Sequence, residues 1–275
     1  MLDDPVAYLD NACVTLKPQS VIDSIQDYYI NTPGCGGRSV HRYGTHVSKT
    51  ISQSRIKLAH FLSSPSVNEI VFTRNATHSL NQIAKGLEWN KGDVVLTTDR
   101  EHNSNLVPWL QLEQEQGIDH RIVRSNQDNT FNLESFEEAC AEAGSNLKMV
   151  SMSHVGNLDG VEIPVKDITK IAKDYGALVS IDGAQSAPHM SVDVQDLGID
   201  FYSFSIHKML GPSGMGGLWG RTELLENMRT IQSGGQTVTS STYDSLEWAK
   251  PPSKFEGGLG HFAGMMATGA AIDYL

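Results

Sequence analysis

The chain has 275 residues, of which 39% are hydrophobic and 19% are charged, so it can bury a substantial core and is not a disordered polymer. Its 21 basic and 32 acidic side chains give a formal net charge of −11, which disfavours nucleic acid and anionic membranes as partners. The acidic N-terminus lacks the features of a secretory signal and no apolar run reaches about 18 residues, so we expect a cytoplasmic protein.

The pattern of apolar residues predicts helices over residues 18–29 and 45–62, separated by a glycine-rich loop. From residue 69 to residue 221, short apolar runs alternate with longer amphipathic runs, which is typical of βα units around a mostly parallel sheet. The expected strands are residues 69–73, 93–98, 120–124, 148–154, 177–182, 201–206 and 215–220. The expected helices are residues 78–87, 104–116, 133–142, 165–175 and 222–228.

After residue 229 a polar stretch rich in glycine, serine and threonine leads to a Pro-Pro pair, the glycines of FEGGLG and a helix over residues 261–275. This helix has no cap, glycine or polar tail at its end, so we expect that the chain has been cut there. We predict an α/β fold with a mostly parallel sheet flanked by helices. Its expected parts are a helical segment with the glycine-rich loop (1–62), an α/β domain (63–260) and the start of a connecting helix (261–275).

Ligands bind at the carboxyl ends of the strands in open parallel sheets, and four polar segments follow predicted strands. In the first, the amides of Ala76 and Thr77 at a helix N-terminus can hold a phosphate or a carboxylate, and the alternative is an ordinary N-cap. The second contains His102, which can stack on a planar ligand and move protons, and the alternative is a solvated capping histidine.

The third segment is ALVSIDGAQ, in which Asp182 ends an apolar strand and Gln185 follows in the turn. A buried carboxylate needs a cationic partner such as a protonated ring nitrogen, and the alternative is an N-cap. In the fourth segment Ser205, His207 and Lys208 close a strand, and this lysine is either a Schiff-base nucleophile or an ordinary surface residue. An amine, a carboxylate, a helix N-terminus and a stacking imidazole together are what pyridoxal 5'-phosphate requires.

The succession RNATHSLN, REHNSNLVPW, SHVGNLDG, SIDGAQSAPHM, FYSFSIHKMLGPSGMGGLW and FEGG resembles the class V aminotransferase family of fold-type I pyridoxal-phosphate enzymes. Within that family the chain is most similar to cysteine desulfurases of the sulfur-mobilisation, selenocysteine lyase-like type, over essentially its whole length. The resemblance implies that Lys208 binds the cofactor aldehyde, Asp182 pairs with the ring nitrogen and His102 stacks on the ring. It further implies Gln185 beside the ring hydroxyl, Asn157 on the substrate side, and a phosphate site of Ala76, Thr77, Ser205 and His207.

By the same resemblance, the protein would convert L-cysteine to L-alanine and retain sulfur as a persulfide for iron–sulfur clusters or other sulfur transfer. It would act as a homodimer with a sulfur-acceptor protein, with Lys208 and His102 as catalytic residues and no metal. The alternatives are another class V enzyme (a lyase, an epimerase or an aminotransferase acting on a related amino acid) and a catalytically idle protein that binds pyridoxal phosphate.

The chain departs from the family pattern in three places. His78 stands where an acidic residue is usual, and Leu259 replaces a threonine that reaches the phosphate across the dimer interface. The sulfur-accepting cysteine and the carboxylate-binding arginine would lie beyond Leu275. The three cysteines present, Cys13, Cys35 and Cys140, have no disulfide or zinc spacing and are expected to be packing or loop residues outside the strand-end constellation.

Overall fold

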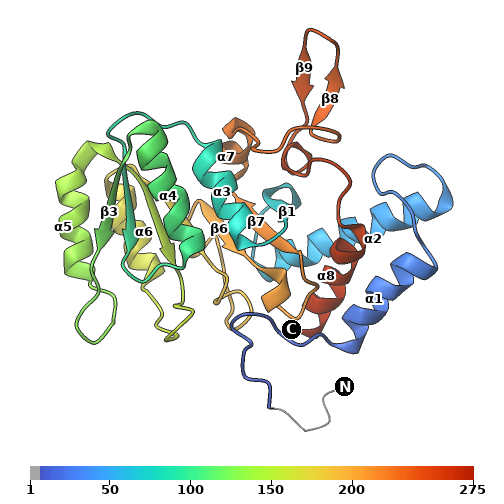
Figure 1. Ribbon diagram of the computed structural model, residues 1–275, viewed down its shortest axis with the longest axis horizontal. Coiled ribbons are helices and arrows are strands. Elements are labelled where there is room, and N and C mark those ends of the chain that lie inside the picture. Colours follow the sequence, from blue (N-terminus) through green and yellow to red (C-terminus); the bar gives the residue numbers. More distant parts are fainter. Residues whose placement is uncertain (1–6) are drawn as a thin grey trace.

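A seven-stranded sheet forms the centre of the molecule in the computed structural model, which describes residues 7–275 (Figure 1). The spatial order of the strands is β1-β7-β6-β5-β4-β2-β3. β7 runs antiparallel to β1 and β6, whereas the other neighbouring pairs are parallel, so the predicted mostly parallel sheet is confirmed. The strands are β1 (Ile70–Thr73), β2 (Val94–Thr98), β3 (Asp119–Val123), β4 (Leu147–Ser153), β5 (Leu178–Asp182), β6 (Phe201–Phe204) and β7 (Gly216–Gly220).

Helices cover both faces of the sheet because successive apolar residues of each central strand point to opposite faces. On β2, Val95 packs with Trp109 in one core cluster, while Val94 and Leu96 belong to the other cluster with Leu58. The clusters place α3, α4 and α7 on one face and α2, α5, α6 and α8 on the other. The helices are α1 (Gln19–Ile30), α2 (Arg42–Phe61), α3 (Ala76–Gly86), α4 (Asn103–Gln116), α5 (Leu133–Ala143), α6 (Val165–Asp174), α7 (Thr222–Asn227) and α8 (Phe262–Tyr274).

The helix α8 packs against α1 and α2 at one end of the molecule (Figure 1). Its residues Ala267 and Ala271 form a small core cluster with Val21 of α1. Gly269 faces α2 so closely that an added Cβ atom would lie 2.6 Å from the Ser54 hydroxyl, so a larger residue there would push the two helices apart. The first and last helices of the chain therefore stabilise each other. The division into residues 1–62, 63–260 and 261–275 stays a prediction.

The predicted elements are present, and their ends shift where a capping side chain decides the boundary. α2 starts at Arg42, three residues earlier than predicted, because the His41 side chain caps it by accepting a hydrogen bond from the Gly44 amide. α3 starts at Ala76, because the Asn75 side chain accepts from the His78 amide at 2.9 Å. Short 3-10 turns, which the sequence pattern did not predict, are η1 (Val67–Glu69), η2 (Gly144–Asn146), η3 (Ile206–Lys208) and η4 (Ser253–Phe255).

A two-stranded antiparallel hairpin projects from the body of the molecule in the stretch that the sequence predicted only as polar (Figure 1). It consists of β8 (Val238–Ser241) and β9 (Leu246–Trp248), and Tyr243 at its tip is fully exposed. The hairpin was missed because it buries almost no side chain, so its sequence carries no alternation of apolar and polar residues. Within residues 7–275, none of the helices combines the length and apolar character that a membrane crossing requires.

Candidate functional site

A cavity of about 470 Å³ opens where β1, β2, β4, β5 and β6 end, at the carboxyl edge of the parallel strands. Its volume lies within the range of roughly 300–1,000 Å³ that is common for small-molecule sites. The structure brings all the sequence-predicted site residues to its wall, although the role of each stays a prediction. They are Ala76, Thr77, His102, Asn157, Asp182, Gln185, Ser205, His207 and Lys208.

The N-terminus of α3 forms one end of the cavity. The Ala76 amide donates a hydrogen bond to the Ser205 hydroxyl at 3.0 Å, and the Thr77 and Ser104 hydroxyls lie 2.6 Å apart. The positive end of the helix dipole and these donors make this end suitable for an anionic group. Burial and the charge of Arg74 lower the pKa of His78, so this imidazole is neutral near pH 7 and adds no charge beside the helix end.

Asp182 and Lys208 provide a carboxylate and an amine in the same cavity. Asp182, the last residue of β5, is 4% exposed, and its Oδ1 accepts a hydrogen bond from the Ala184 amide at 3.0 Å. Burial raises the pKa of this carboxyl, although the Ala184 amide and the charge of Lys208 act in the opposite direction. A cationic group placed against Asp182 would therefore reverse the penalty that burial puts on its charged form.

Lys208 ends the short turn η3 directly after β6 and is half-buried. Burial lowers the pKa of its amine, while Asp182 and Cys13 partly oppose the shift. A lowered pKa increases the fraction of neutral amine, which is the form that attacks a carbonyl carbon. Lys208 thus lies at the cavity with a lowered pKa, and its role as a Schiff-base nucleophile stays a prediction.

His102 faces the cavity from the loop after β2. Its Nδ1 accepts a hydrogen bond from the Ser104 amide at 3.1 Å, so the neutral ring carries its proton on Nε2. Burial and the charge of Lys208 lower the pKa of this imidazole, whereas the Glu101 carboxylate acts to raise it. Glu101, which the sequence interpretation did not single out, accepts hydrogen bonds from Thr98, Asn105 and Ser153 and thereby anchors the loop that carries His102.

The N-terminal segment of residues 10–17 forms a further wall that the sequence interpretation did not find. Gln185 Nε2 donates a hydrogen bond to the Ala12 carbonyl at 2.8 Å, and Lys17 Nζ donates to the His207 carbonyl at 2.8 Å. These partners are 173 and 190 residues apart in sequence, so no local pattern indicated that the segment reaches the cavity.

Cys13 lines the cavity as part of this segment, so the expectation that it lies outside the strand-end constellation is wrong. The hydrogen bonds from Gln185 and Lys17 bring its segment there. Cys35 and Cys140 do not line the cavity. Cys140 is fully buried in α5, where burial raises the pKa of its thiol to about 12.

The two remaining expectations concern the glycine-rich segment near residue 257 and the binding of a carboxylate. Glu256 forms a two-bond ion pair with the Arg55 guanidinium at 2.8 and 2.9 Å and accepts the Phe72 amide at 2.7 Å. Leu259 is exposed and is not part of the cavity wall. Within residues 7–275, no arginine lines the cavity.

Comparison with known proteins identifies the class to which this fold and cavity belong. The family model for aminotransferase class V matches residues 7–275, and the chain belongs to that family, which comprises fold-type I pyridoxal-phosphate proteins. A protein of Halalkalibacterium halodurans named probable cysteine desulfurase is 40% identical over 98% of this chain and 67% of its own length.

Two further relatives are similar over the same region. A cysteine desulfurase of Haloferax volcanii is 37% identical over 98% of this chain and 64% of its own length. The apo structure of the cysteine desulfurase from Thermococcus onnurineus NA1 superposes with a TM-score of 0.93 at 34% identity, over 98% of this chain and 67% of that one. The chain thus spans about two thirds of the length of these relatives.

Proposed function

We propose that the chain binds pyridoxal 5'-phosphate in the cavity at the carboxyl edge of the sheet. One observation carries this proposal: a half-buried amine, a buried carboxylate and a helix N-terminus face the same space of about 470 Å³. The donors of Ala76, Thr77, Ser205 and His207 would hold the phosphate. His102 would lie against the ring face, and Gln185 would stand by the ring hydroxyl.

Each residue of the cavity wall would have a separate role in the reaction. When bound, the cofactor supplies an electron sink for the breaking of bonds in an amino-acid substrate. The Lys208 amine, whose pKa burial lowers, would hold the cofactor through its aldehyde and would be the group that accepts a proton from the substrate. Asp182 would favour the protonated ring nitrogen by its negative charge, and His102 would cover one face of the ring against water. Asn157 orients the group that enters from the opposite side.

The activity that we propose for the protein containing this chain is that of a cysteine desulfurase. The support is the 40% identity to a probable cysteine desulfurase and the 0.93 TM-score to a structure of that name. L-cysteine would yield L-alanine, with its sulfur transferred to a protein thiolate as a persulfide and then to an acceptor protein, in a homodimer. Since the described cavity has no arginine for the substrate carboxylate, we do not expect the 275-residue chain alone to turn over repeatedly.

Binding of the cofactor is tested on the 275-residue chain, with Lys208→Ala as the variant. Added pyridoxal phosphate should turn the protein yellow, and borohydride should then fix a pyridoxyl group on Lys208, as peptide mapping would show. Lys208→Ala should lose this covalent capture completely. A pyridoxyl group found on Lys17 instead, whose amine donates a hydrogen bond to the His207 carbonyl, would show that the wrong amine has been assigned.

The reaction is tested by incubating the protein with L-cysteine and a thiol reductant, which releases the persulfide sulfur as sulfide, and by measuring alanine and sulfide together. The protein to test is the product of the full coding sequence that contains residues 1–275. Equal amounts of the two products would support the desulfurase. Other products from cysteine or from another amino acid would indicate a different class V enzyme. A protein that binds the cofactor and converts no amino acid would be an idle binding protein.

A further inference from the structure

The loop between β4 and α6 carries Asn157 to the cavity but has little of its own to hold it in place. Its base is closed by a bridge between Val155 and Glu162, and its turn by hydrogen bonds from the Gly156 amide to the Val161 carbonyl at 2.9 Å and from the Gly160 amide to the Gly156 carbonyl at 3.0 Å. Leu158 at the tip is 90% exposed. A loop with few buried apolar contacts opens at low free-energy cost unless another element fixes it.

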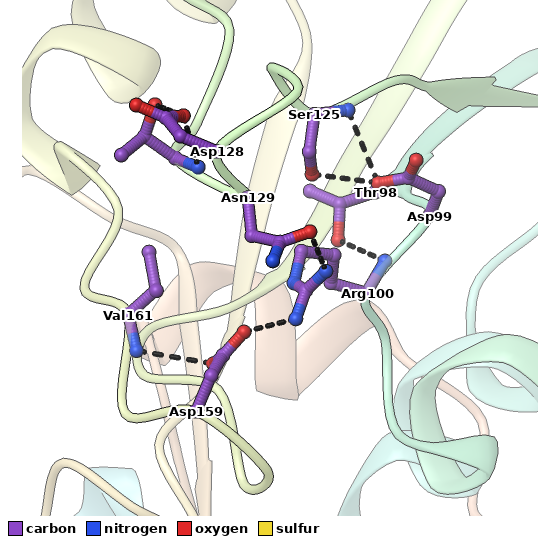
Figure 2. Close-up of polar contacts among 9 residues, drawn as sticks. Thr98, Asp99, Arg100, Ser125, Asp128, Asn129, Asp159 and Val161 are labelled. Atoms are coloured by element: carbon purple, nitrogen blue, oxygen red, sulfur yellow. Dashed lines mark hydrogen bonds and ion pairs between the residues drawn. The ribbon is translucent and has the colours of Figure 1, made fainter.

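Arg100 and Asp159 supply such a fixation from outside the cavity. The Arg100 guanidinium pairs with the Asp159 carboxylate through Nη2, and its Nη1 donates a hydrogen bond to the Asn129 side chain at 2.8 Å (Figure 2). Asp159 in turn accepts the Val161 amide of its own loop at 3.1 Å. The two charged side chains are 31% and 24% exposed, so solvent screens this pair less than it screens a pair on the open surface.

The position of Arg100 in the chain connects this ion pair to the site. Arg100 lies two residues before His102, and the intervening Glu101 accepts hydrogen bonds from the Ser153 amide and hydroxyl at the end of β4. The turn of residues 100–102 therefore contacts both the start and the middle of the segment that carries Asn157. Neither Arg100 nor Asp159 lines the cavity.

We propose that Arg100 and Asp159 are positioning residues. Their ion pair holds the loop that carries Asn157 at the cavity and fixes it relative to the turn that carries His102. The inference rests on the proposed function only for the identity of the ligand. The contacts that hold the loop do not depend on any ligand. The pair holds the loop without lining the cavity, so its loss loosens Asn157 and leaves Lys208 and Asp182 in place. The guanidinium bonds to Asn129 and Asp159 and does not line the cavity.

Hydrogen exchange measured by mass spectrometry on the cofactor-free protein tests the proposal directly. Arg100→Met removes the charge and keeps the stem, and Asp159→Asn removes the opposite charge and keeps an acceptor for the Val161 amide. Each should speed exchange in residues 156–161 by about threefold, because a partly exposed ion pair contributes only a small free energy to holding the loop. The double variant should be no faster than the faster single variant, because both remove the same interaction.

The control is Arg124→Met, which makes the same chemical change beside the same turn. Arg124 lies 3.9 Å from Asp99 and is 75% exposed, so its loss should leave the Asn157 loop unchanged. Arg100→Lys, which keeps a charge for Asp159, should fall between wild type and Arg100→Met. Unchanged exchange in both single variants, additive effects in the double variant, or the same acceleration in Arg124→Met would overturn the proposal.

Titration with pyridoxal phosphate separates this inference from the proposed function. Arg100→Met should weaken binding about threefold, whereas Arg124→Met should not change it. A wild-type protein that fails to bind pyridoxal phosphate would refute the proposed function, and the exchange data would still decide the role of the ion pair. A wild type and an Arg100→Met variant with the same affinity and the same loop exchange would refute the positioning role alone.

Discussion

The cavity and the β8–β9 hairpin represent opposite ways of building structure from this chain. Several hydrogen bonds at the cavity connect residues far apart in sequence, such as Ala76 and Ser205, 129 positions apart, and Thr15 and His207, 192 positions apart. In the hairpin the side-chain bonds span eight positions or fewer, as between Thr242 and Ser245. The cavity therefore exists only when the whole sheet is folded, whereas the hairpin is a local structure. Substitutions at the cavity should therefore have larger effects than substitutions in the hairpin, and five experiments test this contrast.

The largest effect is expected for Asp182→Asn. The affinity for pyridoxal phosphate should fall about 10- to 100-fold, because a hydrogen bond to a charged group contributes about 1.5–3 kcal/mol. The cofactor-free variant should be as stable as wild type or more stable, because burial raises the pKa of Asp182 and so penalises its charged form. Titration and thermal unfolding measure the two effects. Tight binding together with lower stability would show that the carboxylate only caps the Ala184 amide.

The pH dependence of stability sharpens this prediction. Because the pKa of Asp182 is higher in the folded protein than its ordinary value of 3.8, the folded state binds the proton more tightly than the unfolded state. Wild type should therefore lose stability relative to Asp182→Asn as the pH rises from 3.8 through the raised pKa, and the difference should then level off. Urea unfolding of both proteins across this window measures it. A difference that shrinks with rising pH would contradict a raised pKa.

A smaller effect is expected for Lys17→Met, which removes a long-range contact of the N-terminal segment. Lys17 Nζ donates to the Thr15 carbonyl at 2.6 Å and to the His207 carbonyl at 2.8 Å. The free energy of unfolding should fall by about 1–2 kcal/mol, and the affinity for pyridoxal phosphate should fall up to about tenfold. Lys49→Met on the exposed side of α2 is the matched control. Equal losses in both variants would mean that the segment does not complete the cavity.

Thiol labelling tests the placement of Cys13 with two internal controls. Cys13 should react with a maleimide in the cofactor-free protein and react several-fold more slowly after pyridoxal phosphate is added, because the ligand occupies the space that it lines. Cys35 should react at one rate in both states, and Cys140 should stay unmodified because burial raises its pKa to about 12. Mass spectrometry of the labelled peptides gives the rates. Slower labelling of Cys35 alone would place the ligand elsewhere.

The smallest effect is expected in the hairpin. Tyr243→Ser should change the free energy of unfolding by less than about 0.5 kcal/mol and leave the affinity for pyridoxal phosphate unaltered, because the ring is fully exposed in the structure. Titration of the variant beside wild type checks this. A marked loss of affinity would show that the hairpin and the cavity are coupled.

The sequence predicted the sheet well because its central strands are buried on both faces. Runs such as EIVFT and ALVSID can be identified as strands from their own apolar residues. The polar residue that ends each run indicates the edge of the sheet where ligands bind. For that reason the sequence predicts Asp182 and Lys208 at one ligand edge, and both residues line the cavity in the structure. Their roles stay predictions, because position alone does not show what they bind.

The features that sequence reasoning missed depend on contacts between distant segments or on the absence of burial. Cys13 reaches the cavity only because Gln185 and His207 hold its segment. The pairing of Arg100 with Asp159 joins two loops of similar polar composition, in which no local pattern selects the partners. The hairpin lacks the alternation that identifies a half-buried strand.

The packing of α8 against α1 also sets an order of events during synthesis of the chain. Residues 10–17 are synthesised before the loop that carries His207, on which they settle, and the helix that follows them rests on Ala267 and Ala271. Neither surface exists until most of the chain has left the ribosome. The wall formed by Ala12 and Cys13 therefore cannot close until the segments that carry Gln185 and His207 have been synthesised.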